Sequence, residues 1–291
     1  MTRKEPSGAP RVLRYAAFTS DPAGGNPAGV VLDASGLDAD RMRETAAEVG
    51  YSETAFVTAG DADSRRFRVR YFSPLAEVDF CGHATIATAV ALAEQLGAGE
   101  LTFDTNAGEI PVATAVGDDG VVRATLTSVP TWSRPAEDAE VDAALRELRW
   151  TREELDPTLP AHVAFGGVTH LVLAAATRER LAQLDYDFDG LAEVMRQYGW
   201  TTVHLVWREK PDLFHARNPF PVGGVIEDPA TGAAAAAFGG YLRTIAQTPE
   251  TGQATILQGT DISHPSLLTI TTHTTNPRVQ VTGQSTPLPE T

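Results

Sequence analysis

The pattern of hydrophobic and polar positions repeats along the chain. Four blocks occur in the same order in each half, and each counterpart follows 141 to 149 residues later. Ordered self-similarity of this kind indicates that the chain is built from two related units.

The first two blocks predict strands and an amphipathic helix. A glycine turn leads into an apolar strand at residues 25–32 and again at residues 166–173. Residues 38–49 and 189–198 carry apolar side chains at a helical period, and each of these helices is expected to stop at a glycine. Strands at residues 51–57 and 200–206 follow the two helices.

The other two blocks predict a strand and a second helix in each half. Strands that end at a polar residue and a proline occur at residues 68–74 and 213–219. Glycine-containing turns open Ala-rich helices at residues 81–90 and 228–237. A helix without a charged face is expected to be buried on all sides. We therefore predict an α+β fold of two pseudo-twofold-related, barrel-like domains, each wrapped around a central helix.

The domain boundary is expected near residues 128–135, where prolines and polar residues interrupt the pattern. This predicts an N-terminal domain over residues 1–128 and a C-terminal domain over residues 129–291. It leaves open that the final strand returns to the first domain. The tail from Gln284 onward is expected to be unstructured.

Composition and charge exclude several classes of function. The formal net charge of −15 argues against binding of nucleic acid or of an anionic membrane surface. The single cysteine, Cys81, cannot form an internal disulfide, and residues 1–10 contain no apolar stretch typical of a signal peptide. These features favour a cytoplasmic protein that acts on a small molecule.

The two predicted helix starts are candidate binding elements. A helix start offers free backbone N–H groups and the positive end of the helix dipole. Gly82 and Gly232 would let a ligand approach that backbone closely. If the two starts face each other, they would form an anion site suited to a carboxylate. The alternative is that both glycines only permit tight helix packing.

Titratable side chains distinguish the two halves. Three such residues occur where the other half has a different residue, and together they suit acid–base chemistry. They are Glu53 (equivalent to Thr202), His83 (equivalent to Ala230) and Asp228 (equivalent to Cys81). Each also has a structural alternative, because Glu53 could be a solvated residue, His83 an ordinary helix-start histidine and Asp228 a helix cap.

Four short segments, at residues 25–29, 52–57, 80–85 and 227–232, resemble the signature blocks of the PhzF family of phenazine biosynthesis. That family shares its fold with diaminopimelate epimerase. The resemblance implies two α+β barrels with the active site between them, a homodimer, and isomerisation without a cofactor. It implies Glu53 as the base, assisted by His83 and Asp228. The implied substrate-binding positions are Asn26, Gly82, Thr231, Gly232 and Ala233.

Two departures from the family pattern put the particular substrate in doubt. Ala233 stands where the family commonly has serine, and His264 takes the place of the usual basic residue before Pro-Ser. A two-thiol epimerase mechanism is disfavoured because Asp228 occupies the position of the second cysteine.

The sequence therefore predicts an acid–base isomerase of a small carboxylate-bearing substrate. Its reaction would be of the trans-2,3-dihydro-3-hydroxyanthranilate isomerase type or a related biosynthetic step. No metal site is expected, because the histidines show no metal-ligand spacing. Two alternatives stay open: an epimerase or racemase of amino or hydroxy acids on the same fold, and a non-catalytic small-molecule binding protein.

Overall fold

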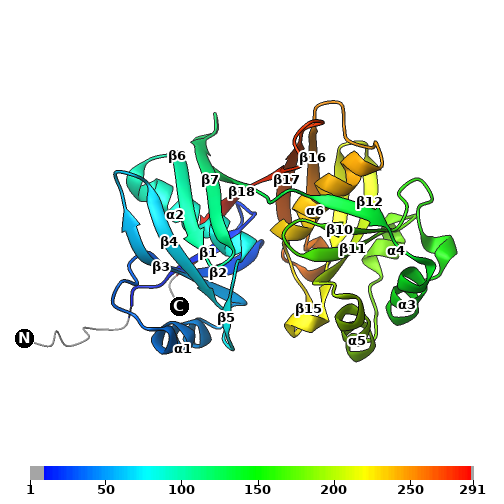
Figure 1. The fold of residues 1–291 in the computed structure, drawn as a ribbon, viewed down its shortest axis with the longest axis horizontal. Coiled ribbons are helices and arrows are strands. Elements are labelled where there is room, and N and C mark those ends of the chain that lie inside the picture. The colour runs from blue at the N-terminus through cyan, green and yellow to red at the C-terminus, as the bar shows by residue number, and fades with distance from the viewer. Residues whose placement is uncertain (1–9, 290–291) are drawn as a thin grey trace, which may run out of the picture. The chain divides into compact units, whose positions relative to one another are not determined.

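A computed structural model describes residues 10–289, which divide into two compact units (Figure 1). The first unit contains the chain up to Pro22, residues 27–126 and the chain from Gly283. The second contains residues 23–26 and 127–282. The expectation about a signal peptide concerns residues that lie almost wholly outside the described part.

The first unit is built on a mixed sheet with the strand order β1-β2-β3-β4-β6-β7-β8. Pairs β2–β3 and β4–β6 are parallel, whereas β3–β4, β6–β7 and β7–β8 are antiparallel. The short strand β5 pairs with β4. The strands are β1 (Leu13–Ala17), β2 (Asn26–Val31), β3 (Glu53–Asp61), β4 (Arg66–Phe72), β5 (Glu77–Val78), β6 (Gly99–Thr105), β7 (Gly108–Val116) and β8 (Val122–Thr127).

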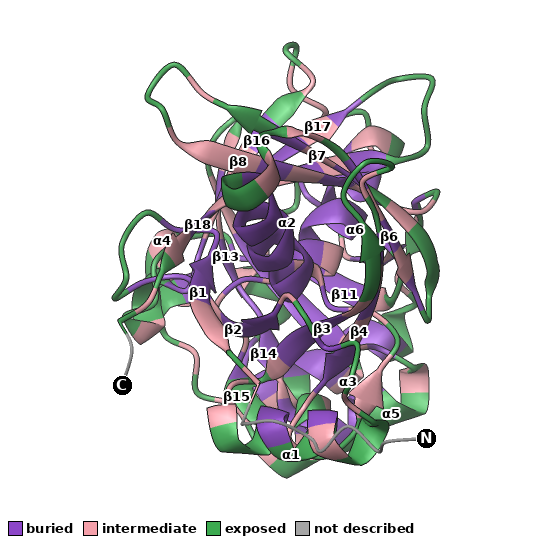
Figure 2. Ribbon diagram, turned by 90° about the vertical axis from the view of Figure 1, so that its left-hand side faces the viewer, coloured by how far each residue is buried: buried purple, intermediate pink, exposed green. Residues whose placement is uncertain are grey.

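Two helices accompany this sheet. Helix α1 (Ala39–Val49) begins after Asp38, whose side chain accepts a hydrogen bond from the Arg41 N–H, and it ends at Gly50 with φ of 75°. Helix α2 (Gly82–Leu96) is buried at every position from His83 to Ala93 (Figure 2). It contacts β1, β3 and β7. The sheet therefore curls around α2, as the absence of a charged face on this helix predicts.

The second unit has the strand order β17-β16-β13-β12-β11-β10-β9. Its pairs are antiparallel except for β11–β12 and β13–β16. A separate two-stranded sheet is formed by β14 and β15. The strands are β9 (Trp132–Pro135), β10 (His162–Phe165), β11 (Thr169–Ala174), β12 (Thr202–Lys210), β13 (Leu213–Arg217), β14 (Pro219–Phe220), β15 (Val225–Glu227), β16 (Gln253–Gln258) and β17 (Ser266–Thr272).

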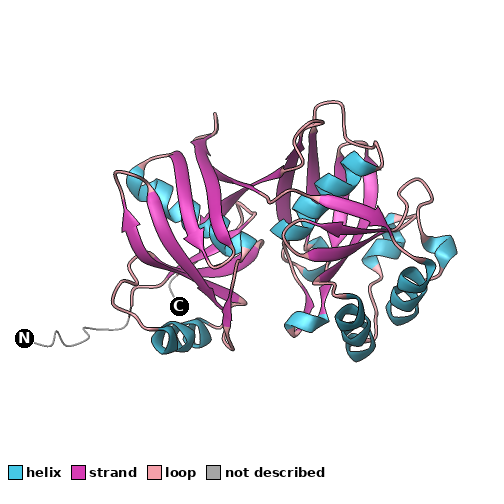
Figure 3. Cartoon of the chain, in the orientation of Figure 1, coloured by secondary structure: helices cyan, strands magenta, loops and turns pink. Residues whose placement is uncertain are grey.

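Helices α3, α4 and α5 belong to the second unit, and α3 packs against α5 (Figure 3). Their apolar faces belong to a core that also contains the inner residues of β11 and β12. Three short 3-10 helices complete the unit. The helices are α3 (Asp138–Leu148), α4 (Arg178–Ala182), α5 (Phe188–Tyr198), η1 (Arg152–Glu154), η2 (Pro221–Gly223) and η3 (Thr260–Ile262).

Helix α6 (Gly232–Thr244) is the central helix of the second unit. It contacts β9, β10, β11 and β17, and its residues from Ala234 to Leu242 are buried. A Cβ atom at Gly166 would lie 2.5 Å from the Ala233 carbonyl oxygen and 2.5 Å from the Ala237 nitrogen. Only glycine therefore allows the turn before β11 to lie against the backbone of this helix.

Strand β18 (Val279–Pro287) contributes to both units. Its first residues pair with β17, as in Val279 opposite Thr272. Its last residues pair with β1, as in Pro287 opposite Tyr15. The expectation of an unstructured tail from Gln284 is therefore wrong over residues 284–287, because backbone pairing with a strand distant in sequence orders this segment.

The fold class predicted from the sequence is confirmed, because in each half of the repeat the strands surround a buried helix. The predicted strands and helices are found with shifts of a few residues at their ends. Helix α5, for example, begins at Phe188 with Asp187 as its N-cap. Among the described residues, no helix combines the length and the apolar character needed to cross a membrane.

Candidate active site

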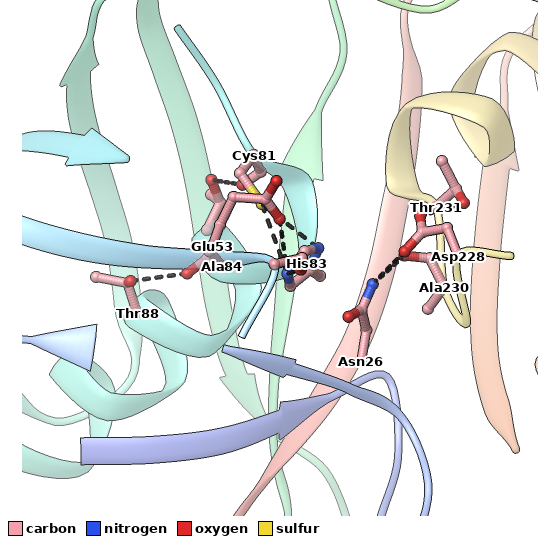
Figure 4. A network of polar contacts seen from close by, with 11 residues as sticks. Asn26, Glu53, Cys81, His83, Ala84, Thr88, Asp228, Ala230 and Thr231 are labelled. Carbon is pink, nitrogen blue, oxygen red and sulfur yellow. Dashed lines mark hydrogen bonds and ion pairs between the residues drawn. The ribbon is translucent and has the colours of Figure 1, made fainter. Parts of the chain in front are cut away.

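The three residues expected to carry the acid–base chemistry belong to two close groups of side chains, one in each unit. In the first unit Glu53, Cys81 and His83 form what we call the N-terminal cluster (Figure 4). Glu53 Oε2 lies 3.4 Å from His83 Nε2 and accepts a hydrogen bond from the Cys81 thiol at 3.5 Å. Cys81 Sγ lies 3.4 Å from His83 Nδ1 and 3.7 Å from Nε2.

Local structure holds this cluster in place. Glu53 is the first residue of β3, where parallel pairing puts it opposite Ala28 of β2. Cys81 is the N-cap of α2, and its carbonyl oxygen accepts hydrogen bonds from the Thr85 N–H at 3.0 Å and the Thr85 hydroxyl at 2.7 Å. The buried Tyr71 hydroxyl lies 2.7 Å from that same threonine hydroxyl. The start of α2 is therefore anchored to β4.

The cluster combines a carboxylate, an imidazole and a thiol, which are all groups that accept and donate protons. His83 and Cys81 are 6% and 7% exposed, and the Glu53 side chain is 19% exposed. The carboxylate is thus the most accessible of the three groups. Ser52 adds a hydroxyl 3.4 Å from His83 Nε2. A substrate proton could pass to Glu53 while His83 holds that carboxylate by a hydrogen bond.

In the second unit, Asn26, Asp228, Thr231 and Gln258 form what we call the C-terminal cluster. Asp228 Oδ1 accepts a hydrogen bond from Asn26 Nδ2 at 2.7 Å, and Oδ2 accepts one from the Thr231 hydroxyl at 2.5 Å (Figure 4). Asn26 Nδ2 also lies 3.0 Å from the Ala230 carbonyl oxygen. Both oxygens of Asp228 are therefore oriented by neutral donors.

The buried Gln258 ties this cluster together. Its Nε2 donates to the Asp228 carbonyl oxygen at 2.7 Å and to the Thr231 hydroxyl at 3.1 Å, and its Oε1 accepts from the Thr231 N–H at 3.3 Å. Gln258 is the last residue of β16, about 30 positions beyond the motif that it supports. Sequence reasoning missed Gln258 and Ser52, since neither carries a signal of its own.

Both central helices begin without a capping side chain. Cys81 and Thr231 occupy the N-cap positions of α2 and α6, and neither makes a side-chain capping hydrogen bond. The structure thus places Gly82 and Gly232 at the first positions of two helices, as the sequence predicts. Helix starts of this kind suit a carboxylate. Ala233, the next residue of α6, offers no hydroxyl.

A buried ion pair supports the strand before Asp228. Arg217 Nη2 lies 2.5 Å from Glu227 Oε2, and the two side chains are 8% and 2% exposed. Burial raises the pKa of Glu227, and the hydrogen bonds and charge of Arg217 oppose that rise. The pair fixes the end of β15 directly before the C-terminal cluster.

A buried polar layer lies at the counterpart of the Glu53 position. Thr202 lies 2.8 Å from His170 Nδ1 and 3.5 Å from Asn218 Oδ1, and that oxygen is 2.9 Å from His204 Nδ1. The Asn218 carbonyl oxygen accepts a hydrogen bond from the Asp228 N–H at 2.9 Å. This layer therefore helps to hold the backbone of the C-terminal cluster.

A separate cavity of about 440 Å³ in the second unit is lined by residues of neither cluster. Its arginines already have acidic partners. Arg149 pairs with Asp185 at 2.6 Å, and Arg180 pairs with Glu154 at 2.9 Å. The cavity is therefore a weaker candidate for a catalytic site than the two clusters.

The family model for phenazine biosynthesis-like proteins (PhzC-PhzF) matches residues 15–291. The chain belongs to this family. A trans-2,3-dihydro-3-hydroxyanthranilate isomerase of Pseudomonas aeruginosa is 32% identical over 255 residues, which cover 86% of each chain. An uncharacterized isomerase of Bacillus subtilis is 34% identical over 239 residues, which cover 80% of each chain.

Solved structures give the same result. A phenazine biosynthesis protein of the PhzF family from Bacillus anthracis matches with a TM-score of 0.84 and 26% identity over 96% of each chain. A probable proline racemase from Agrobacterium radiobacter matches with a TM-score of 0.64 at 12% identity, over 94% of this chain and 90% of the other, and shows likeness of fold alone.

The comparisons confirm the family resemblance carried by the four motifs, and they assign the chain to the isomerases. These comparisons therefore argue against a non-catalytic binding protein. The roles of the individual site residues, and the expectation that both helix starts serve one site, stay predictions.

Proposed function

We propose that Glu53 moves a proton between two carbons of a small carboxylate-bearing substrate. The reaction would be of the trans-2,3-dihydro-3-hydroxyanthranilate isomerase type, or a related biosynthetic step, and it would need no cofactor. The observation that carries this proposal is the position of the partly exposed Glu53 carboxylate, 3.4 Å from a buried imidazole and 3.5 Å from a buried thiol. Of the described acidic residues, Glu53 has the neighbours best suited to acid–base work.

In the proposed reaction, Glu53 removes a proton from a carbon next to a double bond. The C–H bond breaks, its electron pair shifts into the neighbouring bond, and the far carbon of the old double bond becomes electron-rich. The protonated carboxyl group then delivers its proton to that carbon. The double bond has moved, the carboxylate is regenerated, and no oxidant or reductant is consumed.

His83 is proposed to orient Glu53 and to support its change of charge. A ring N–H at Nε2 can donate to the ionised carboxylate, and this interaction weakens when the carboxyl group takes up the substrate proton. A neutral imidazole can also relay a proton. His83 is therefore an assisting group, and its loss should cost less than the loss of Glu53.

The C-terminal cluster is proposed to bind the substrate and to orient it by hydrogen bonding. The uncapped N–H groups at the start of α6, around Gly232 and Ala233, suit the substrate carboxylate, as do those at Gly82 in the first unit. Thr231 and Asn26 keep Asp228 in one orientation, so that it can accept a hydrogen bond from a substrate polar group. Ala233 leaves this region less polar than a serine would.

The test is isomerisation in deuterated water, with trans-2,3-dihydro-3-hydroxyanthranilate as the first substrate. Glu53→Gln should lower turnover by about 10²- to 10⁴-fold, and deuterium incorporation into the product should fall by the same factor. Glu77→Gln is the matched control, because Glu77 is a half-buried glutamate of the same unit paired with Arg70. Normal turnover by Glu53→Gln would refute the assignment.

A thiol-based epimerase is the second candidate, and the contact between Cys81 Sγ and His83 Nδ1 favours it. Cys81→Ser distinguishes the two functions. The proposed isomerase retains most of its activity in this variant, whereas an enzyme that uses the thiol as its base loses it. An inactive Cys81→Ser variant together with an active Glu53→Gln variant would refute the proposed isomerase and support the thiol-based epimerase.

We further propose a cytoplasmic homodimer that binds neither nucleic acid nor membranes. The strong negative charge supports the absence of nucleic-acid and membrane binding, and the single, buried cysteine supports the compartment. The homodimer is what the resemblance to the PhzF family implies. Light scattering of the purified chain tests the dimer, and a monomer at micromolar concentration would contradict it.

A further inference from the structure

We propose that the N-terminal cluster is a binding site for one thiophilic divalent cation such as Zn²⁺, held by Cys81, His83 and Glu53, and that the bound ion stops proton transfer. The histidine spacing in the sequence gives no indication of this site. It arises because β3 brings Glu53 to the start of α2. Among the described residues, this is the group of three metal-ligating side chains whose ligand atoms all lie within 4.8 Å of one another.

The spacing of the three ligand atoms matches one face of a tetrahedral zinc site. With Zn–S bonds of about 2.3 Å and Zn–N and Zn–O bonds of about 2.0–2.1 Å, tetrahedral angles put sulfur about 3.6 Å from nitrogen or oxygen, and nitrogen about 3.3 Å from oxygen. The observed distances are 3.7 Å for Sγ to Nε2, 3.5 Å for Sγ to Oε2 and 3.4 Å for Nε2 to Oε2. The three side chains thus need little movement to bind an ion.

The ligand types select the ion. A thiolate with an imidazole suits Zn²⁺, Cd²⁺ or Co²⁺, whereas Mg²⁺ and Ca²⁺ prefer sites made wholly of oxygen ligands. On binding, the Cys81 thiol releases its proton to solvent, and the thiolate and the Glu53 carboxylate together balance the charge of the dication. Three protein ligands leave the fourth position to water or to a substrate group.

The ion would reach the site from the side of Glu53, because this side chain is more exposed than those of Cys81 and His83. Once bound, it occupies the carboxylate oxygen that would otherwise accept the substrate proton. Inhibition by the metal therefore rests on the proposed function, whereas metal binding itself does not.

Metal binding is measured on the full chain without substrate. Co²⁺ is added as a spectroscopic probe, and the affinity for Zn²⁺ is found by competition with a chromophoric chelator. We expect one ion per chain and a thiolate-to-Co²⁺ charge-transfer band in the near ultraviolet, which only Cys81 can supply because it is the sole cysteine. Cys81→Ser should abolish the band and weaken Zn²⁺ binding by at least about 100-fold.

His215→Gln is the matched control, because His215 and Glu209 form another close histidine–glutamate pair, at 2.8 Å. It should bind as the wild type does, and a circular dichroism spectrum shows that each variant is folded. Wild-type protein that binds no Zn²⁺ at micromolar concentration, or folded Cys81→Ser that binds it equally well, overturns the site. If Zn²⁺ binds at the cluster but no isomerisation is found, the site stands and the proposed function fails.

Discussion

Replacing Arg217 by methionine should leave a buried negative charge without its partner. Arg217 Nε lies 3.1 Å from both carboxylate oxygens of Glu227, and Nη2 lies 2.5 Å from one of them. Arg217 Nη1 also donates to the Ala182 carbonyl oxygen at 2.7 Å. Methionine fills much of the space but supplies none of these donors, while Glu227 stays almost fully buried.

The size of the effect follows from this burial. Removing one partner of a buried ion pair costs about 3–5 kcal/mol of the free energy of unfolding. In a domain of roughly 150–250 residues, each kcal/mol lowers the melting temperature by about 2–4 °C. The second unit of Arg217→Met should therefore melt roughly 6–20 °C below wild type at pH 7.

The loss should shrink in acid. Burial and the nearby Asp261 raise the pKa of Glu227, and only Arg217 opposes them. Without Arg217 the folded-state pKa rises further above its unfolded value, so the folded state binds more protons. Stability linked to such a group is present at low pH and is lost as the pH rises through the folded pKa. The gap between variant and wild type should thus be smaller at pH 5 than at pH 7.

Tryptophan fluorescence is the appropriate assay, because all four tryptophans lie in the second unit. Thermal melts of wild type, Arg217→Met and the double variant Arg217→Met/Glu227→Gln are compared at both pH values. The double variant should regain most of the lost stability, since it carries no buried charge. An equal gap at both pH values, with a double variant no better than the single one, would show that the cost is lost packing.

Two further predictions concern the second unit. Burial lowers the pKa of His170 to about 3 and that of His204 to about 4. The unfolded chain therefore binds more protons than the folded one below pH 6.5, and stability falls as the pH drops from there towards 4. Replacing both histidines by glutamine should flatten this pH dependence of stability, as measured by urea unfolding. Gly166→Val should lower the urea midpoint strongly because its side chain meets the backbone of α6, whereas Gly36→Ala, with open space around it, should leave the midpoint unchanged.

The repeat and the buried helices were predictable from local pattern. Helix α1 ends at Gly50 in a left-handed conformation, and α2 is buried from His83 to Ala93, as its lack of a charged face indicates. The paired structure of residues 284–287 was not predictable, because its cause is β1, almost the whole chain away. Local patterns reveal an element, but not which distant element will pair with it.

The candidate site was predictable in its residues and only partly in its contacts. The motifs single out Glu53, His83 and Asp228. They do not show that a thiol would lie close to both of the first two, since that requires the start of β3 to meet the start of α2. Nor do they show that Asn26, the first residue of β2, donates a hydrogen bond to Asp228, 202 positions later in the chain.

The duplicated strands explain why the proposed proton chemistry belongs to one half. Glu53 lies opposite Ala28 across the parallel pair β2–β3, and its counterpart Thr202 lies opposite His170 across the parallel pair β11–β12. The small Ala28 leaves room beside a carboxylate that stays partly exposed. In the second half His170 fills that room, bonds to Thr202 and is itself fully buried and uncharged. The same backbone position therefore holds an accessible acid–base group in the first unit and a sealed polar contact in the second, where it supports the backbone before α6.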